Sequence, residues 1–208
     1  RDFCLSRGLG DVYKRQSVNT TLAFVHTLPG GDREFSFYRN PGADMMLSES
    51  DIDYKLVQNS RIFHFGSLSM TGEICEAATK KAVETAKESG AIISFDPNLR
   101  ENLWDSLDKA REKIAYGISE CDILKISDNE IQWFTGEQDF DRAVEILRGR
   151  YGNIKLLLLS LGKNGSRAYC GENSAFAPAV PANTIETTGA GDTFCGGILA
   201  KVLEYGLR

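Results

Sequence analysis

The segment TTGAGDTFCGG, residues 187–197, places three residues with little or no side chain directly before an aspartate. An apolar run follows Asp192, and this pattern predicts that a helix starts here. The first N–H groups of a helix have no intrahelical partners and lie at the positive end of the helix dipole. Gly189, Ala190 and Gly191 would therefore let phosphate oxygens approach these N–H groups closely, without a cationic side chain.

Asp192 would repel a phosphate, so its presence beside a phosphate-binding turn needs a reason. A carboxylate at this point suits a general base, which accepts a proton from a substrate hydroxyl while the turn stabilises the transferring phosphoryl group. The alternative is that Asp192 only caps a helix after a glycine-rich connection. The chain contains no G-x-x-x-x-G-K-[ST] segment, so the turn is not a P-loop.

Strand and helix patterns alternate along most of the chain. Strands are expected at 61–68, 91–96, 122–127 and 154–162, and helices at 71–90, 106–119, 128–134, 139–150 and from about 191. Thr71 and Gly90 are suited to begin and end the first of these helices. This alternation predicts an α/β fold with a mostly parallel sheet and helices on both faces.

Two hairpins interrupt the alternation. Residues 20–28 and 34–40 are rich in β-branched and aromatic residues and flank a Pro-Gly-Gly-Asp segment, and residues 166–180 form a second candidate hairpin. The first hairpin should project from the α/β body as a small flap. We assign residues 17–47 to this flap and 48–208 to the core.

Composition excludes several classes of protein. A net charge of −5 without a basic cluster argues against a nucleic-acid partner, and the longest apolar run, 156–159, is too short to span a membrane. The five cysteines are scattered and form no C-x-x-C pair, which is typical of reduced thiols in a cytoplasmic protein. His26 and His64 lie in strand patterns without metal-ligand spacing, and we interpret both as structural.

Residues 1–16, RDFCLSRGLGDVYKRQ, resemble translated vector or adapter sequence more than native protein, and they are excluded from the fold prediction. We expect both ends of the chain to be cut, with the core incomplete at its C-terminus.

Several segments accompany the glycine turn in a fixed order: EFSFYRNPGADMML, FHFGSLSM, SFDPNLRENLW, LKISDNEIQWFTG and LLSLGKNGS. Together they resemble the ribokinase-like (PfkB) carbohydrate kinases, and most closely the fructokinases, from residue 17 to residue 208. The resemblance implies a three-layer, Rossmann-type fold with a β lid. It also implies transfer of the γ-phosphoryl group of ATP to the primary hydroxyl of a hexose, with fructose giving fructose 6-phosphate.

The resemblance assigns roles at the phosphate end of the site. Asp192 matches the family's catalytic base, and Gly189, Ala190 and Gly191 match its anion hole. Glu130 matches the glutamate that helps to place Mg²⁺, usually through water, although a glutamate at a helix start is also favourable for the helix dipole alone. Ser127 departs from the asparagine that the family often has at that position.

Other positions match cation and nucleotide segments of the family. Glu186 and Thr188 match a loop that binds a monovalent cation such as K⁺, but the family usually has Asp where this chain has Glu186. Ser160, Gly162 and Gly165 match the turn that faces the nucleotide. The alternative is that these three residues form an ordinary glycine-containing turn after a buried strand. Their place at the carboxyl end of a strand favours the nucleotide-binding role, because ligands gather there in open α/β sheets.

On the sugar side, the family's contacts fall on Phe37 and Arg39 in the flap and on Asn98 and Arg100 in DPNLR. Strand alternation puts Arg39 on one face with Phe35 and Phe37, which suits a polar ring substrate. A contact between two flaps in a homodimer is the alternative for this face. For Asn98, the alternative is that it only satisfies the turn at Pro97 together with Asp96.

The sequence is also compatible with a kinase for another substrate and with a protein that is not a kinase. The same chemistry would serve 2-keto-3-deoxygluconate or a nucleoside, and a non-catalytic sugar-binding relative or an inactive fragment would share the fold. The family's N-terminal Gly-Gly motif and sugar-binding Asp do not occur before Ser17, and its closing adenine-pocket segment would follow Arg208.

Overall fold

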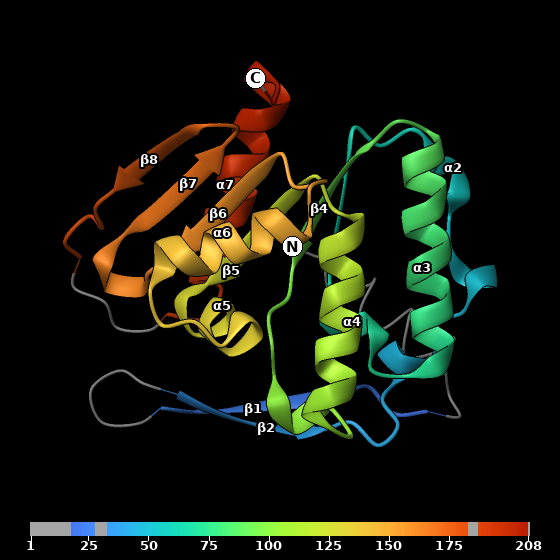
Figure 1. Ribbon diagram of the computed structural model, residues 1–208. Helices are drawn as coiled ribbons and strands as arrows, with labels where there is room; N and C mark the ends of the chain where they lie inside the picture. The colour runs from blue at the N-terminus through green and yellow to red at the C-terminus, as the bar shows by residue number, and fades with distance from the viewer. Residues whose placement is uncertain (1–17, 28–32, 183–186, 208) are drawn as a thin grey trace.

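The described residues of the computed structural model, 18–27, 33–182 and 187–207, build a six-stranded sheet with the strands in sequential order (Figure 1). The first four strands are parallel: β3 (Ile62–Gly66), β4 (Ile92–Asp96), β5 (Ile123–Ser127) and β6 (Leu156–Ser160). The last two, β7 (Ser166–Cys170) and β8 (Asn173–Ala177), are antiparallel and form the second predicted hairpin. The predicted leader, residues 1–16, lies outside the described residues.

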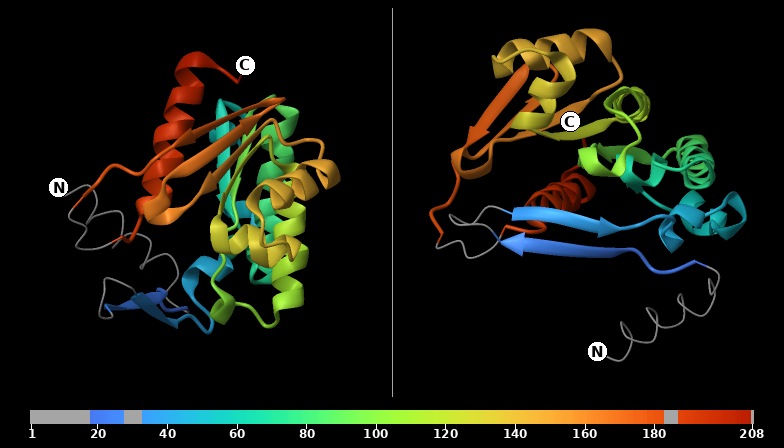
Figure 2. Two further views of the ribbon diagram at one scale, coloured as in Figure 1. Left: turned by 60° about the vertical axis from the view of Figure 1, so that its left-hand side comes forward. Right: turned by 90° about the horizontal axis from the view of Figure 1, so that it is seen from below.

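Helices cover both faces of this sheet, as predicted (Figure 2). One face carries α3 (Glu73–Glu88), α4 (Leu107–Glu120), α5 (Asp128–Thr135) and α6 (Phe140–Arg150). The other face carries α7 (Ala190–Tyr205). A short helix, α2 (Tyr54–Gln58), packs beside α3. Among the described residues, no helix is long and apolar enough to cross a membrane.

Strand alternation divides the apolar core into two layers. Leu124 and Ile126 belong to the large cluster under α3 to α6, whereas Ile123 packs with Leu158 and Val202 in the smaller cluster under α7. Successive side chains of a strand point to opposite faces, so one strand serves both layers. The near-continuous apolar strands of the sequence follow from this two-sided burial.

The first hairpin forms a separate two-stranded sheet, which confirms the predicted flap. Strands β1 (Leu22–Thr27) and β2 (Arg33–Tyr38) pair antiparallel, with Leu22 opposite Tyr38. In Figure 2 the hairpin lies apart from the main sheet, beyond the turn that precedes α7. The Asn102 side chain donates a hydrogen bond of 3.1 Å to the Phe35 carbonyl and so joins the flap to the loop after β4.

The predicted start of the helix at 71–90 is wrong in one detail. Helix α3 begins at Glu73 with Gly72 at the N-cap, and no side chain caps it. Thr71 instead ends the 3₁₀ turn η3 (Ser67–Met70), where its hydroxyl donates to the Leu68 carbonyl at 2.9 Å. The 3₁₀ turn engages the threonine locally before the helix starts. Gly90, with φ of +78°, follows the helix end as predicted.

Candidate active site

The first turn of α7 forms the centre of the candidate site. Gly189 occupies the N-cap with φ of +75°, a left-handed conformation that favours glycine, and no side chain caps the helix. Asp192 lies three residues further on, in the first turn, and its Oδ2 atom is 3.9 Å from the position that a Cβ on Gly189 would occupy. Asp192 is therefore not the cap of this helix, and its carboxylate lies beside the glycine turn.

Polar side chains occupy the middle and the carboxyl ends of the strands, on the face that α7 covers. Ile62, Ile92 and Ile123 contribute to the apolar cluster under α7. Two or four residues later on the same strands, and thus on the same face, stand polar residues: His64, Ser94, Asp96 and Lys125. The α7 face of the sheet thus changes from apolar to polar toward the first turn of α7.

Asp96 and Lys125 form a buried ion pair within this polar set. The Lys125 Nζ atom lies 2.9 Å from Oδ2 and 3.1 Å from Oδ1 of Asp96. Burial raises the pKa of Asp96 to about 6, and the neighbouring Lys125 opposes this shift. Burial alone would lower the pKa of Lys125, but the charge and hydrogen bond of Asp96 raise it overall. Both groups are consequently ionised at neutral pH.

His64, Ser94 and Cys195 complete the polar set. The Nδ1 atom of His64 lies 2.9 Å from the Ser94 hydroxyl. Burial lowers the pKa of His64, and the charge of Asp192 opposes this, so the two side chains lie within electrostatic reach of each other. Burial also raises the pKa of the Cys195 thiol. Together these interactions connect the start of α7 to the middle of β3 and β4.

A cavity of about 410 Å³ opens beside the glycine turn, and the structure brings the nucleotide candidates to it. Ser160, Gly162 and Gly165 line this cavity together with Ala190 and Gly191. Two segments that are 25 or more residues apart in the sequence thus face one space. Its position outside the carboxyl ends of parallel strands is where open α/β sheets bind ligands.

Other residues of this cavity were not predicted from the sequence: Ser127, Asp128, Ser166, Phe194 and residues 177–179. Asp128 begins α5 directly after β5. Ligands often bind at the carboxyl ends of parallel strands, so this position could have indicated a role in the cavity. Phe194 follows Asp192 by two residues but is indistinguishable in the sequence from a core residue. Residues 177–179, Ala-Pro-Ala, carry no polar signal at all.

Glu130 connects two strand ends. Its Oε2 atom accepts hydrogen bonds from the Ser127 backbone N–H at 2.9 Å and from the Ser127 hydroxyl at 2.7 Å, and its Oε1 atom accepts one from the Leu99 N–H at 2.7 Å. Ser127, the departure from the expected asparagine, is the N-cap of α5 and forms a capping box with Glu130. Glu130 therefore has a structural role whatever else it binds.

The aromatic face of the flap meets the loop after β4. Phe35 and Phe37 stack with ring centroids 6.0 Å apart, and the Arg100 guanidinium lies 5.4 Å from the Phe35 centroid. Asn98 has φ of +44°, and its N–H donates to Asp96 Oδ1 at 3.2 Å, so the Asp96 side chain does satisfy the turn at Pro97. The structure thus brings the flap and Arg100 together.

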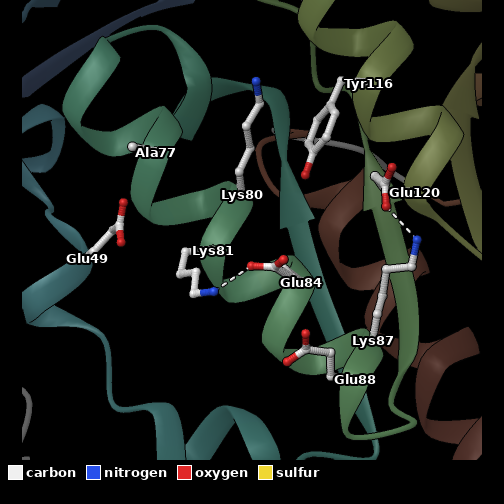
Figure 3. Close-up of a pocket in the computed structure, with 9 residues that line it drawn as sticks. All are labelled: Glu49, Ala77, Lys80, Lys81, Glu84, Lys87, Glu88, Tyr116 and Glu120. Atoms are coloured by element: carbon white, nitrogen blue, oxygen red, sulfur yellow. Dashed lines mark hydrogen bonds and ion pairs between the residues drawn. The ribbon is translucent and has the colours of Figure 1, made fainter.

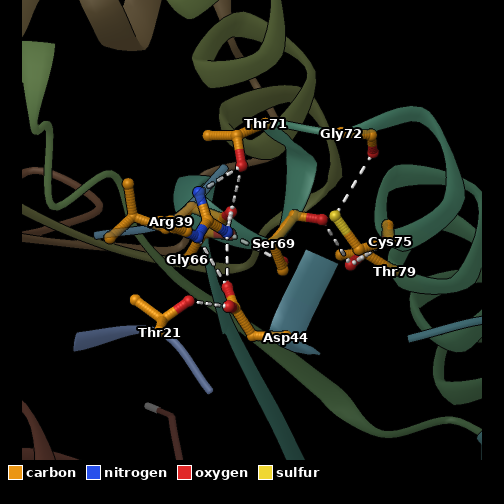
Figure 4. A network of polar contacts seen from close by, with 10 residues as sticks. Thr21, Arg39, Asp44, Gly66, Ser69, Thr71, Gly72, Cys75 and Thr79 are labelled. Atoms are coloured by element: carbon orange, nitrogen blue, oxygen red, sulfur yellow. Dashed lines mark hydrogen bonds and ion pairs between the residues drawn. The ribbon is translucent and has the colours of Figure 1, made fainter. Parts of the chain in front are cut away.

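Arg39 directly follows strand β2, which ends at Tyr38. The alternation of exposed and partly buried residues along this strand continues through Arg39. The Arg39 side chain is only 6% exposed, and it donates to Asp44 at 2.7 Å, to Thr71 at 2.7 Å and to the Leu68 carbonyl at 3.2 Å (Figure 4). Asp44 also accepts a hydrogen bond from Thr21. This network fixes the base of the flap to the segments before α3.

Of the two residues assigned to a monovalent-cation loop, Glu186 and Thr188, the structure describes only Thr188. Glu186 lies outside the described residues. Thr188 is exposed in the turn that leads into Gly189. Within the described part of the chain, no three His, Cys, Asp or Glu side chains are grouped as a metal site.

A model of the pfkB family of carbohydrate kinases matches residues 10–207. The chain belongs to this family. It is 41% identical over 189 residues to the probable fructokinase-2 of Arabidopsis thaliana, an alignment that covers 91% of this chain and 57% of that relative. The chain thus spans little more than half the length of this relative.

Solved structures of fructokinases share the fold. The fructokinase of Xylella fastidiosa with bound ATP has a TM-score of 0.80 and 29% identity, covering 90% of this chain and 58% of that one. The fructokinase of Vibrio cholerae, in its fructose-, ADP- and calcium-bound form, has a TM-score of 0.80 and 28% identity, covering 89% and 59%. The predicted ribokinase-like architecture is confirmed.

A second hollow, of about 600 Å³, lies between α3 and α4 and is distinct from the candidate site (Figure 3). Its charged side chains pair with each other: Lys81 with Glu84 at 2.6 Å and Lys87 with Glu120 at 2.5 Å. None of the residues that the pfkB resemblance singles out lines it. This hollow is a solvated, charge-paired helix surface.

The Arg39 network leads to a prediction for this pfkB chain. In the full-length protein, Arg39→Ala should lower the free energy of unfolding by about 1–3 kcal/mol, because Asp44 and Thr71 lose a charged donor. Urea denaturation measures this loss. Arg61→Ala is the control, since that exposed side chain donates a single hydrogen bond among the described residues, to the Leu203 carbonyl at 2.9 Å. Equal stability of the two variants would show that the network does not hold the flap.

Proposed function

We propose that this chain carries the catalytic base and the phosphate-binding turn of an ATP-dependent fructokinase, which converts fructose to fructose 6-phosphate. The observation that carries the proposal is the cavity in which Gly191 and Ala190 face Ser160 and Gly162, with Asp192 in the same helical turn. The fructokinase names of the relatives favour fructose as the acceptor.

In the proposed reaction, the primary hydroxyl oxygen of the sugar attacks the γ-phosphorus of ATP. The bond from that phosphorus to the bridging oxygen breaks, ADP leaves, and the hydroxyl proton passes to the Asp192 carboxylate. The N–H groups at the start of α7 stabilise the negative charge on the phosphoryl oxygens. Because Asp192 is not needed as a helix cap, its carboxylate is available for this proton.

Glu130 fits a role in holding Mg²⁺ through water rather than directly. Both of its oxygens already accept hydrogen bonds from the protein, so little of the carboxylate remains for a direct bond to metal. Mg²⁺ usually keeps several water ligands and binds the phosphates of its substrate, where it neutralises their charge. Thr188 and Glu186 are proposed to hold a monovalent cation such as K⁺.

For the sugar, Phe37, Asn98 and Arg100 are the proposed contacts. Arg100 already lies over the Phe35 ring, so the flap and the loop after β4 can enclose a polar ring between them. Arg39 would act on the sugar through the position of the flap, since its guanidinium is engaged with Asp44 and Thr71.

The outer face of the flap suits a second copy of the chain. Leu22, Phe24 and Tyr38 are exposed by 51%, 55% and 68%, which is unusual for large apolar side chains. We propose a homodimer in which two flaps cover each other. Sedimentation of wild type and Phe24→Asp should show a dimer and a monomer, respectively.

A substrate panel tests the proposed activity. ADP release by the full-length protein would be measured with ATP, Mg²⁺ and, in turn, fructose, glucose, 2-keto-3-deoxygluconate and adenosine. We expect the highest kcat/KM with fructose and loss of turnover on chelation of Mg²⁺. A higher kcat/KM with another acceptor would keep the mechanism and change the substrate, whereas binding without turnover would indicate a non-catalytic relative.

A further inference from the structure

We propose that Lys125, held by Asp96, is a positioning residue for phosphoryl transfer. Its ammonium lies beneath the turn formed by residues 189–192 and sets the position and the electrostatic potential of that turn. The inference rests on the proposed kinase function and adds to it a residue that the sequence analysis did not single out.

The absence of a side chain at Gly191 is what lets Lys125 approach. A Cβ atom on Gly191 would lie 3.2 Å from the Nζ atom and 3.7 Å from the Cε atom of Lys125. The first of these distances is shorter than ordinary van der Waals contact, so a side chain at position 191 would require the ammonium to shift by a few tenths of an ångström. Gly191 thus faces the ligand cavity and at the same time accommodates Lys125.

Asp96 determines where the ammonium points. The side chains of Asp96 and Lys125 are only 6% and 8% exposed, and Nζ lies within 3.1 Å of both carboxylate oxygens. Asp96 is itself oriented by the Asn98 N–H, at 3.2 Å from Oδ1. Asp96 ends β4 and Lys125 lies in the middle of the neighbouring β5, so the rigid sheet fixes the pair and leaves Lys125 little freedom to move.

The charges around Lys125 explain why a cation is useful there. The carboxylate of Glu130 acts on both members of the ion pair, and Asp192 lies in the turn above. The incoming phosphate adds further negative charge. A buried ammonium among these groups would reduce their mutual repulsion, because charges interact strongly where water is excluded.

Stability alone does not explain the pair. Replacing a buried ion pair by apolar residues is often neutral or stabilising, whereas removing one partner is strongly destabilising. The adjacent positions on the same face, Ile123 and Leu158, are apolar and well buried. An apolar pair would therefore suit the fold, and the position of this charged pair beside the glycine turn points to the reaction.

A double variant separates this role from a structural one. Lys125→Met alone leaves Asp96 as an unpaired buried carboxylate and should lower the melting temperature. Asp96→Asn with Lys125→Met removes both charges at nearly constant volume and should restore it. If Lys125 serves the reaction, kcat of the double variant stays about 10²-fold below wild type, the effect of losing one preorganised electrostatic group. The KM values for fructose and ATP should change little.

A double variant with wild-type melting temperature and wild-type kcat would overturn the proposal, because the pair would then be purely structural. Lys125→Arg is the second variant, for the case in which the double variant does not fold. It keeps the charge and the partner, but the wider guanidinium must press on Gly191. We expect a folded protein with reduced kcat, and unchanged kcat would again overturn the proposal.

An ion pair at the opposite end of the strands provides the control. Lys155 and Asp122, which directly precede β6 and β5, lie 2.8 Å apart, and the Lys155 side chain is 63% exposed. Lys155→Met should leave kcat unchanged. The proposed kinase function has a test of its own: it is refuted if wild-type protein transfers no phosphate from ATP to any sugar. The role of Lys125 is refuted by a double variant with wild-type kcat.

Discussion

Asp192→Asn in the full-length protein is expected to lower kcat by about 10²–10⁴-fold, the usual effect of removing a general base. Asparagine has nearly the same shape, so the start of α7 and the packing of Phe194 should survive. It cannot accept the proton of the attacking hydroxyl. Fructose and ATP should still bind, because the glycine turn and the cavity beside it remain.

The measurement is kcat from initial rates, together with both binding constants by calorimetry. Glu204→Gln serves as the control, since this exposed carboxylate near the other end of α7 pairs with Lys201, one turn away in the same helix. A helix-cap role for Asp192 would predict near-normal activity, because Asn caps helices as well as Asp. A fall in kcat of less than tenfold would therefore exclude Asp192 as the base.

Gly191→Val is expected to lower kcat by about 10²–10³-fold, comparable with the loss of one oxyanion donor. The Cβ atom would stand 3.2 Å from the Lys125 ammonium, and the branched methyl groups would crowd the ligand cavity. Both effects displace the N–H groups that stabilise the phosphoryl oxygens. Unlike Asp192→Asn, this variant should also weaken ATP binding.

Initial rates and ATP calorimetry again provide the test, with Gly196→Val as the matched control. Gly196 lies in the same helix, and no described atom would come within 4 Å of its Cβ. Equal effects of the two valines would mean that helix propensity, not the site, explains the loss. Asp192→Asn and Gly191→Val combined should cost less than the product of their separate effects, because both act on one transition state.

The order of the elements and the main feature of the site could be predicted from the sequence alone. The α/β alternation, the flap and the helix that begins at the glycine turn depend on local hydrophobic periods and on turn residues, which neighbouring residues specify. Ser160, Gly162 and Gly165 were placed at a strand end for the same reason. Ligands gather at the carboxyl ends of parallel strands, so a nucleotide role was expected for these residues.

Only the tertiary structure decided which distant side chains touch. The hydrogen bonds of Arg39 to Asp44 and Thr71 were not predicted, because Thr71 is 32 residues further along the chain. Lys125 reads in the sequence as an interruption of a buried strand. Its partner is 29 residues earlier in the chain, and the glycine above it is on the last helix. Such contacts depend on the register of neighbouring strands and on how α7 packs on the sheet, and no local pattern encodes either.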